Sequence, residues 1–450
     1  MMQINYRLFI LLALLLSAVS HTLNAQTLYT LADCEQMAIK NNNRIKNGKL
    51  GVQIAGQTRK EAFTNYFPSV SGTGTYFNAH SGLMKSSINP QDVISPDLAG
   101  MLPAELQGAL LSPISVSLLK NGMVGGVTAT QPIFAGGRIV NGNKLAKIGE
   151  EVARIQMELT EDEVVLTTHT YYWQIVNLKE KLATITAVEE MLTTLQKDVN
   201  VAVKAGLSTR NDVLRVELQL HDVASNRLKV ENGIKVSKML LAQFMGADMI
   251  HFDLENRVDN DCQEPTAFFQ DAGTAVMNRP ETQLLDRNIR AAKLKTKMSL
   301  GEQLPTIGVG GGYLYNDLLN KSNNSSVVFA TVSVPISGWW GGSHARKRHK
   351  LMEQQAINDR TNNIELMTVE TNQVWNELVE AHAQIILAES SIQSATENLR
   401  IVGDSYKSGI VPLTDLLDAQ VLFQQSKNLY SDAYSVYQIK ILKYRQITDH

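Results

Sequence analysis

The segment "AGLSTRNDVL", residues 205–214, has a counterpart late in the chain in "SGIVPLTDLL", residues 408–417. Each contains a glycine, then polar or turn-forming residues, and then Asp, an aliphatic residue and Leu. A glycine after a helical stretch commonly ends the helix, and Ser, Thr or Pro at the following positions begins another. The two segments therefore predict two helix–turn–helix tips, near Gly206 and Gly409.

The spacing of matched residues indicates that the chain is duplicated. Residues in the first part of each copy lie 237 positions apart, and later residues lie 203 apart. The first group is Asn41/Asn278 and Pro68/Pro305, and the second is Pro132/Pro335 and Gly206/Gly409. The difference between the two spacings is 34 residues. These extra residues of the first copy fall within 81–121, so one loop of that copy is long. This predicts repeats over 26–246 and 272–446, joined by a segment, 247–271.

Between the matched prolines, apolar residues alternate with a period of two, as in "PSVSGTGTYFN" and "SSVVFATVSVPI". The predicted strand pairs are 69–80 with 122–134, and 305–316 with 326–337. Strands of about ten residues match tilted membrane-spanning β-strands, but an ordinary soluble hairpin fits the alternation equally well. Two hairpins cannot close a barrel in one chain, so a membrane interpretation requires several chains.

Residues 137–205 and 342–408 contain no proline, and their apolar residues recur every three to four positions. Each stretch predicts a helix roughly 100 Å long at 1.5 Å per residue. A second helix is expected after each tip, over 208–245 and 412–446, with Ser208 as N-cap and Pro412 in the first turn. The tips would then lie at the far end of two helical hairpins, away from the strands.

The first residues predict export. Arg7, the apolar run "LFILLALLLSAV" and the small-residue site "LNAQ" are typical of a signal peptide, here 1–25. The run is shorter than the ~20 residues that a membrane-spanning helix needs. Two cysteines, Cys34 and Cys262, could pair or simply stay buried, and the position of Cys34, well beyond the cleavage site, disfavours lipidation. The net charge of −2 gives no reason to expect nucleic acid as a partner.

Other motifs offer little chemistry. His344 and His349 in "GGSHARKRHK" could suggest metal or nucleic-acid binding, but a solvated or lipid-headgroup-facing helix start is the simpler interpretation. The glycine-rich stretches lack the strand–loop–helix context of a phosphate loop. No nucleophile motif or Cys-rich site is present, so we predict no catalytic residues, no cofactor, no metal site and no enzyme activity.

The chain resembles the TolC family of outer-membrane efflux proteins. The resemblance covers nearly the whole mature chain, from "TLADCEQMAIKNNNRI" onward, and is most specific at "AGLSTRNDVLRVELQL" and "SGIVPLTDLLDAQVLF". It implies a mainly α fold with a β-barrel part. Three chains would each supply four strands to a 12-stranded outer-membrane β-barrel, which a long periplasmic α-helical barrel continues.

The resemblance also implies a function: a passive exit duct of a tripartite export system in the cell outer membrane. The homotrimer would sit in outer-membrane lipid and conduct drugs, small molecules or secreted polypeptide. A periplasmic adaptor and an inner-membrane transporter, of the RND or ABC type, would dock at the tips and supply the energy. The alternative is a periplasmic or surface coiled-coil structural protein without transport activity, which explains the helices but not the duplicated strand lengths.

By the same resemblance, Asp415 and Asp418 match two family positions that face the lumen at the periplasmic entrance. Three chains would give a narrow ring of carboxylates that favours cations. Tyr406 and Asp212 match a pair that links neighbouring hairpins in the closed gate. Acidic residues in a first helical turn also complement the helix dipole, which explains Asp212 and Asp415 equally well.

The family's arginine in the second tip is replaced here by Val411, and Arg210 in the first tip is a candidate substitute. The resemblance also makes the two turns the docking site for the adaptor. The residues concerned are Gly206, Leu207, Ser208, Gly409, Ile410 and Val411.

Overall fold

The computed structural model describes residues 27–80, 83–95, 97, 101, 103, 114–118, 120–247, 252–255, 262–318 and 321–449. The predicted signal peptide lies outside the described residues. The chain divides into two compact units. The helical unit comprises Met1–Ile54, Glu151–Arg287 and Asn358–His450, and the sheet unit comprises Ala55–Glu150 and Asn288–Ile357.

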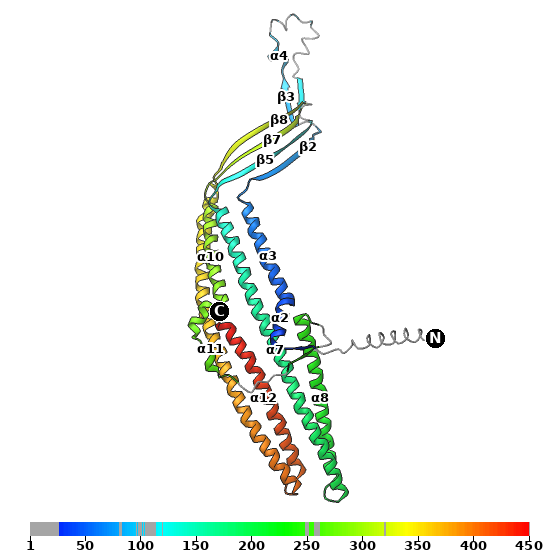
Figure 1. Ribbon diagram of the computed structural model, residues 1–450. Helices are drawn as coiled ribbons and strands as arrows, with labels where there is room; N and C mark the ends of the chain where they lie inside the picture. The colour runs from blue at the N-terminus through cyan, green and yellow to red at the C-terminus, as the bar shows by residue number, and fades with distance from the viewer. Residues whose placement is uncertain are drawn as a thin grey trace, which may run out of the picture. The chain divides into compact units, whose positions relative to one another are not determined.

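Helices make up most of the described chain (Figure 1). Four are long: α7 (Arg138–Lys204), α8 (Arg210–Met245), α11 (Gly338–Lys407) and α12 (Leu413–Thr448). The others are α2 (Leu31–Asn41), α3 (Asn43–Thr64), α4 (Pro90–Val93), η1 (Pro265–Phe268), α9 (Ala272–Asn278) and α10 (Pro280–Gly301). α11 begins four residues before the expected 342, and α8 begins two residues after the expected 208.

The first helical stretch of the chain is divided at Asn42 into α2 and α3. Asn42 has an extended backbone, and its side-chain oxygen accepts a hydrogen bond from the Arg44 amide at 2.7 Å. Its side-chain amide donates to the Phe244 carbonyl of α8 at 2.8 Å. One asparagine therefore ends α2, begins α3 and ties both helices to α8.

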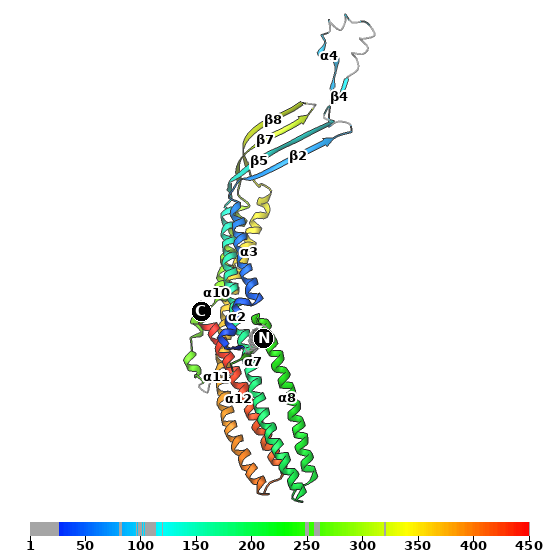
Figure 2. The ribbon, with the colours of Figure 1, turned by 45° about the vertical axis from the view of Figure 1, so that its right-hand side comes forward.

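The sheet unit contains a four-stranded antiparallel sheet (Figure 2). Its order is β2 (Ser69–Asn78), β5 (Asn121–Ala135), β7 (Thr306–Leu318) and β8 (Lys321–Ser333). The sequence places the last strand at 326–337, whereas the ladder with β7 begins at Lys321 and ends at Ser333. Pro335, two residues after Ser333, has no N–H to donate, so the ladder is favoured to end before it.

The two outer strands of this sheet, β2 and β8, each pair with one strand among the described residues. Both also expose large apolar side chains, including Tyr76 at 69% and Val328 at 89%. An unpaired strand edge with exposed apolar residues is a template for pairing with another chain. Inside the long loop of the first half, β3 (Met84–Ile88) pairs with β4 (Ile114–Leu118) in a separate antiparallel ladder.

The helical unit is centred on a group of buried aromatic side chains. Trp173 of α7 and Tyr434 of α12 meet with ring centroids 5.6 Å apart. Beside them, β1 (Thr27–Tyr29) pairs in parallel with β6 (Phe252–Leu254). The Tyr172 hydroxyl donates to the Glu255 carbonyl at 2.7 Å, and the Tyr437 hydroxyl donates to the Gln263 carbonyl. The described parts of 247–271 are thereby held against the helices.

Cys34 is fully buried in this aromatic core and Cys262 is half-buried, and the two form no disulfide. Burial, with Asp33 and Glu35 nearby, raises the pKa of the Cys34 thiol to about 12. Among the described residues, no helix is long and apolar enough to cross a membrane.

Candidate functional site

The two tips adopt the same turn. At the end of α7, Gly206 has a φ of 76°, and at the end of α11 Gly409 has a φ of 73°. The amide of Leu207 donates to the Ala202 carbonyl at 2.8 Å, and that of Ile410 donates to the Ser405 carbonyl at 2.9 Å. These are Schellman turns, which require a left-handed residue after the helix. A Cβ at either glycine would meet nothing within 4 Å, so backbone conformation and not space demands glycine here.

The start of the returning helix differs between the tips. In the first, Thr209 is the N-cap of α8 and forms a capping box with Asp212. The Asp212 carboxylate accepts from the Thr209 amide at 3.0 Å, the Thr209 hydroxyl at 2.7 Å and the Ser208 hydroxyl at 2.9 Å. In the second tip the N-cap is Pro412, which has no side chain able to cap. The N-cap of α8 is thus Thr209, one residue after the expected Ser208. Pro412, expected in the first turn of its helix, is the N-cap one residue before α12.

These hydrogen bonds have an electrostatic consequence for the first tip. The Thr209 hydroxyl and amide, followed by smaller effects of Ser208 and Arg215, hold the pKa of Asp212 below its ordinary value of 3.8. Asp212 is thus a charged capping residue under neutral conditions.

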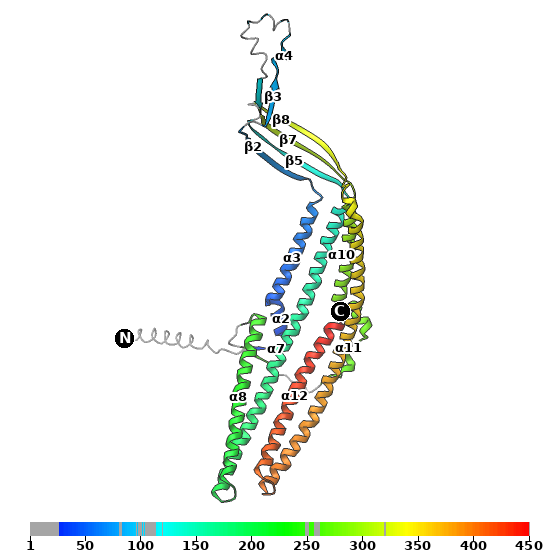
Figure 3. The same cartoon turned by 180° about the vertical axis from the view of Figure 1, so that it is seen from behind.

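The two tips share one apolar cluster and lie side by side (Figures 1 and 3). Val199 of α7, Val216 of α8, and Leu413 and Leu416 of α12 are buried in it. Leu207 and Ile410, at the outer ends of the turns, remain 84% and 75% exposed. The cluster fixes the two turns next to each other, while their outermost apolar side chains stay available for contact.

Asp415 and Asp418 lie on the exposed side of α12. They are three residues apart, so they share one helix face, opposite the buried Leu416. The hydroxyl of Thr414 donates to Asp415 at 3.3 Å, and Asp418 has no hydrogen bond or ion pair among the described residues. Two carboxylates therefore stand next to each other in water, close to the second tip.

Tyr406 of α11 is half-buried against the same cluster. Burial raises the pKa of Tyr406, and the nearby carboxylates of Asp212 and Asp198 raise it further. The structure thus brings Tyr406 close to Asp212, although no hydrogen bond joins them within this chain. Arg210, exposed at the first position of α8, makes no ion pair with any described residue, and Val411 of the other tip is half-buried.

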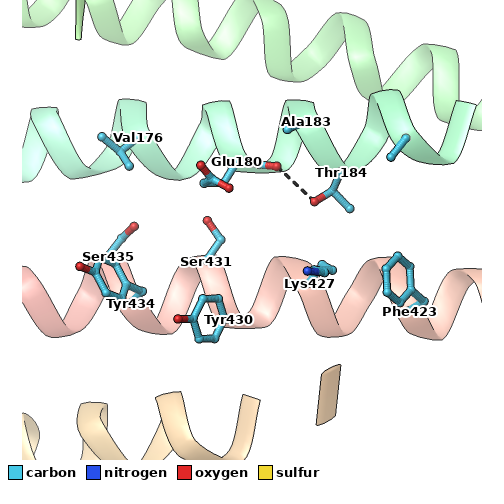
Figure 4. A pocket seen from close by; sticks show the side chains of 11 residues that line it. Val176, Glu180, Ala183, Thr184, Phe423, Lys427, Tyr430, Ser431, Tyr434 and Ser435 are labelled. Atoms are coloured by element: carbon cyan, nitrogen blue, oxygen red, sulfur yellow. Dashed lines mark hydrogen bonds between the residues drawn. The ribbon is translucent and has the colours of Figure 1, made fainter. Parts of the chain in front are cut away.

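A recess of about 500 Å³ lies further along the hairpins, between α7 and α12 (Figure 4). Figure 4 shows Glu180 of α7 and Ser431 of α12 directed toward each other across it, with Lys427 and Tyr430 alongside. Its lining contains no His or Cys. Over the described residues, no group of three or more His, Cys, Asp or Glu side chains is placed to hold a metal ion. His344 and His349 are five residues apart on α11, about 140° around the helix, so they do not share a face.

The element order, the four-stranded sheet and the paired helical hairpins define the fold of outer-membrane channel proteins. The chain is similar to the crystal structure of the Campylobacter jejuni CmeC outer membrane channel, with a TM-score of 0.73 and 15% identity over 93% of this chain and 85% of that one. It is also similar to the outer membrane protein VceC from Vibrio cholerae, with a TM-score of 0.70 and 12% identity over 93% and 95%. The open state of the Neisseria gonorrhoeae MtrE channel matches with a TM-score of 0.71 and 14% identity over 93% and 88%.

No protein-family model matches the sequence, and no curated protein sequence does. At these identities the structural likeness establishes the fold. The TolC-like fold, mainly α with a smaller β part, is thereby confirmed.

Two features of the site were not expected from the sequence. The first is the capping role of Thr209, although "TRND" has the spacing of a capping box with Asp at the fourth position. The second is the recess between α7 and α12, because no local sequence pattern encodes the distance between two hairpins.

Proposed function

We propose that the chain is one protomer of a homotrimeric outer-membrane exit duct. The observation that carries the proposal is the sheet with two unpaired edges, β2 and β8, in a chain with the fold of outer-membrane channels. In lipid every backbone N–H and C=O must be paired, so an open sheet is not viable there. Joining β8 of one protomer to β2 of the next pairs all edges in a 12-stranded barrel. The 203- and 237-residue spacings support internal repeats as the origin of the four strands.

The long helices would form the periplasmic part of the duct. Several carry large apolar side chains that remain exposed in the single chain, among them Leu228 of α8, and Ile386 and Leu387 of α11. Exposed apolar surface of this kind is typical of protein contacts. Packing of neighbouring protomers along these helices would bury it and close an α-helical barrel.

The duct conducts passively, and its partners supply energy and choose the cargo of drugs, small molecules or secreted polypeptide. A periplasmic adaptor and an RND or ABC transporter would engage the tips. The exposed Leu207 and Ile410 support docking there, because neither side chain is needed for the fold of its turn. The two turns that expose Leu207 and Ile410 are formed by their neighbours Gly206, Ser208, Gly409 and Val411.

Asp415 and Asp418 would face the lumen at the periplasmic entrance, giving six carboxylates per trimer. Their exposure on one face of α12 supports this placement. Tyr406 and Asp212, brought together within one chain, and Arg210, which makes no ion pair with a described residue, would link neighbouring hairpins in the closed gate.

The loop at 81–121, of which a large part lies outside the described residues, would be extracellular. Asn89, between β3 and α4, is exposed and suits a tag. Such a tag is expected to be labelled on intact cells. Labelling only after permeabilisation would reverse the orientation.

Membrane fractionation tests the proposal. Heat-modifiable trimers in the detergent-extracted outer membrane are expected, with ion conductance after reconstitution into planar bilayers. A soluble, extended monomer or dimer would instead support the alternative, a periplasmic or surface coiled-coil structural protein. The single-chain sheet with exposed apolar edges argues against that alternative, because such edges aggregate in water.

A further inference from the structure

Positive charge is concentrated in one part of the sheet unit. Its helical segments, 55–64, 138–150, 288–301 and 338–357, carry thirteen Lys and Arg but only three Glu. The whole chain carries 42 basic and 44 acidic residues. The excess is therefore local, in the helix segments that lead into and out of the strands.

This charge is poorly compensated within the chain. Neither α7 nor α11 has an acidic residue in its first turn, and α7 begins with Arg138 at the positive end of its dipole. Lys144 and Lys147 are one turn apart, as are Arg346 and Lys350, and like charges at this spacing repel. An external anion near these helix starts would relieve the repulsion.

Part of this charge converges on a hollow of about 610 Å³ between α3 and α7. Lys60 of α3, and Lys144 and Lys147 of α7, line it and make no ion pair with any described residue. Arg59 also lines it and pairs with Glu150 at 2.9 Å. The lining thus carries a net charge of three positive units.

The hollow is preformed by contacts between its two helices. Besides the Arg59–Glu150 pair, the side-chain amide of Asn143 on α7 donates to the Ala62 carbonyl in the last turn of α3 at 2.9 Å. The Gln131 amide of β5 donates to the Tyr66 carbonyl, just after α3, at 3.0 Å. The lysines therefore surround a cavity whose walls are already joined.

Aromatic side chains border the hollow toward the strands. Phe63 and Tyr66 line it, and Phe63 meets Tyr66 and Phe67 with centroids 5.4 and 5.6 Å apart. All three remain exposed, as do Trp339 and Trp340 at the matching junction of β8 and α11. Exposed aromatics between apolar strands and charged helices are typical of a membrane–water interface.

We propose that the hollow between α3 and α7 binds the phosphate of an anionic phospholipid at the membrane surface. The lysine ammonium groups would contact the phosphate oxygens, and Phe63 and Tyr66 the glycerol and first acyl carbons. The inference rests on the proposed function, because it requires the strands to lie in a membrane. The aromatic border favours a lipid over a soluble anion, which needs no apolar contact.

The test offers the purified full-length protein an equimolar mixture of phosphatidylglycerol and phosphatidylcholine in detergent and counts bound lipids by native mass spectrometry. The native protein should retain phosphatidylglycerol at least about fivefold over phosphatidylcholine, in line with the attraction of a few lysines for an anionic headgroup. The double variant Lys144→Gln, Lys147→Gln should lose most of this preference. Lys60→Gln, on the opposite wall, should lower it as well.

The matched control is Lys197→Gln, Lys204→Gln, which removes the same charge from exposed positions at the other end of α7. It should bind lipid as the native protein does. Equal retention of both lipids by the native protein, or an unchanged preference in Lys144→Gln, Lys147→Gln, would overturn the inference. So would displacement of the lipid by millimolar inorganic phosphate, which would make the hollow a simple anion site.

Bilayer conductance of the same preparations separates this inference from the proposed function. Channels with no lipid preference would reject the lipid site alone. A protein that neither enters membranes nor conducts would reject the proposed function, and the lipid site with it.

Discussion

Truncation of the capping aspartate, Asp212→Ala, tests whether Asp212 stabilises the start of α8 more strongly than Asp415 stabilises the start of α12. Asp212 accepts three hydrogen bonds from Thr209 and Ser208, whereas Asp415, at the corresponding position of the second tip, accepts one from Thr414 at 3.3 Å. We expect Asp212→Ala to loosen the start of α8 far more than Asp415→Ala loosens the start of α12.

The magnitude follows from the two contributions of each residue. A side-chain cap contributes about 1 kcal/mol, and a negative charge in the first turn about 0.5 kcal/mol. Asp212 supplies both contributions, about 1.5 kcal/mol together, and Asp415 supplies only the second. Since 1.4 kcal/mol is a tenfold change in an equilibrium constant, local opening should rise about tenfold in α8 and about twofold in α12.

Hydrogen exchange measured by mass spectrometry on peptides spanning 205–216 and 408–419 reads these openings directly. Because the folded-state pKa of Asp212 is lowered below 3.8, its stabilisation is present above that pH and is lost as the pH falls through the folded-state pKa. The difference between native protein and Asp212→Ala should be constant from pH 5 to 7 and shrink below about pH 4.

Thr209→Ala removes the other half of the capping box and serves as a matched variant. Its effect should be similar to that of Asp212→Ala, and the double variant should add little more. Equal exchange increases at both tips, or no increase in α8 at pH 6, would refute the capping account of Asp212.

Three further outcomes are expected. The channel should be cation-selective and blocked from its periplasmic side by trivalent cations, and Asp415→Asn with Asp418→Asn should weaken that block at least about tenfold; equal block in both proteins would remove these aspartates from the entrance. Gln420→Met should raise the free energy of unfolding by about 1–3 kcal/mol, because neither polar atom of the buried Gln420 amide has a hydrogen-bond partner among the described residues; a lower denaturation midpoint would contradict this. Cys34, with its pKa near 12, should resist iodoacetamide at pH 8 until the protein is unfolded, and rapid labelling of Cys34 itself in the folded protein, located by peptide mass spectrometry, would disprove its burial.

Local chemistry determines the features that could be predicted from the sequence. The glycines at 206 and 409 mark the tips because a left-handed residue after a helix is strained for any residue with a Cβ. The proline-free stretches before them mark the long helices, whose observed ends lie within four residues of the expected ones. Both signals arise between residues a few positions apart in the chain, so the sequence alone carries them.

The tertiary structure decides what joins distant residues. The pairing of β5 with β7 and the parallel contact of β1 with β6 each depend on hydrogen bonds between segments far apart in the chain. The same holds for the approach of Tyr406 to Asp212, and for the hollow that Lys60 and Lys144 line from two helices. Such contacts are selected by which surfaces can be buried together, and that choice belongs to the folded chain as a whole.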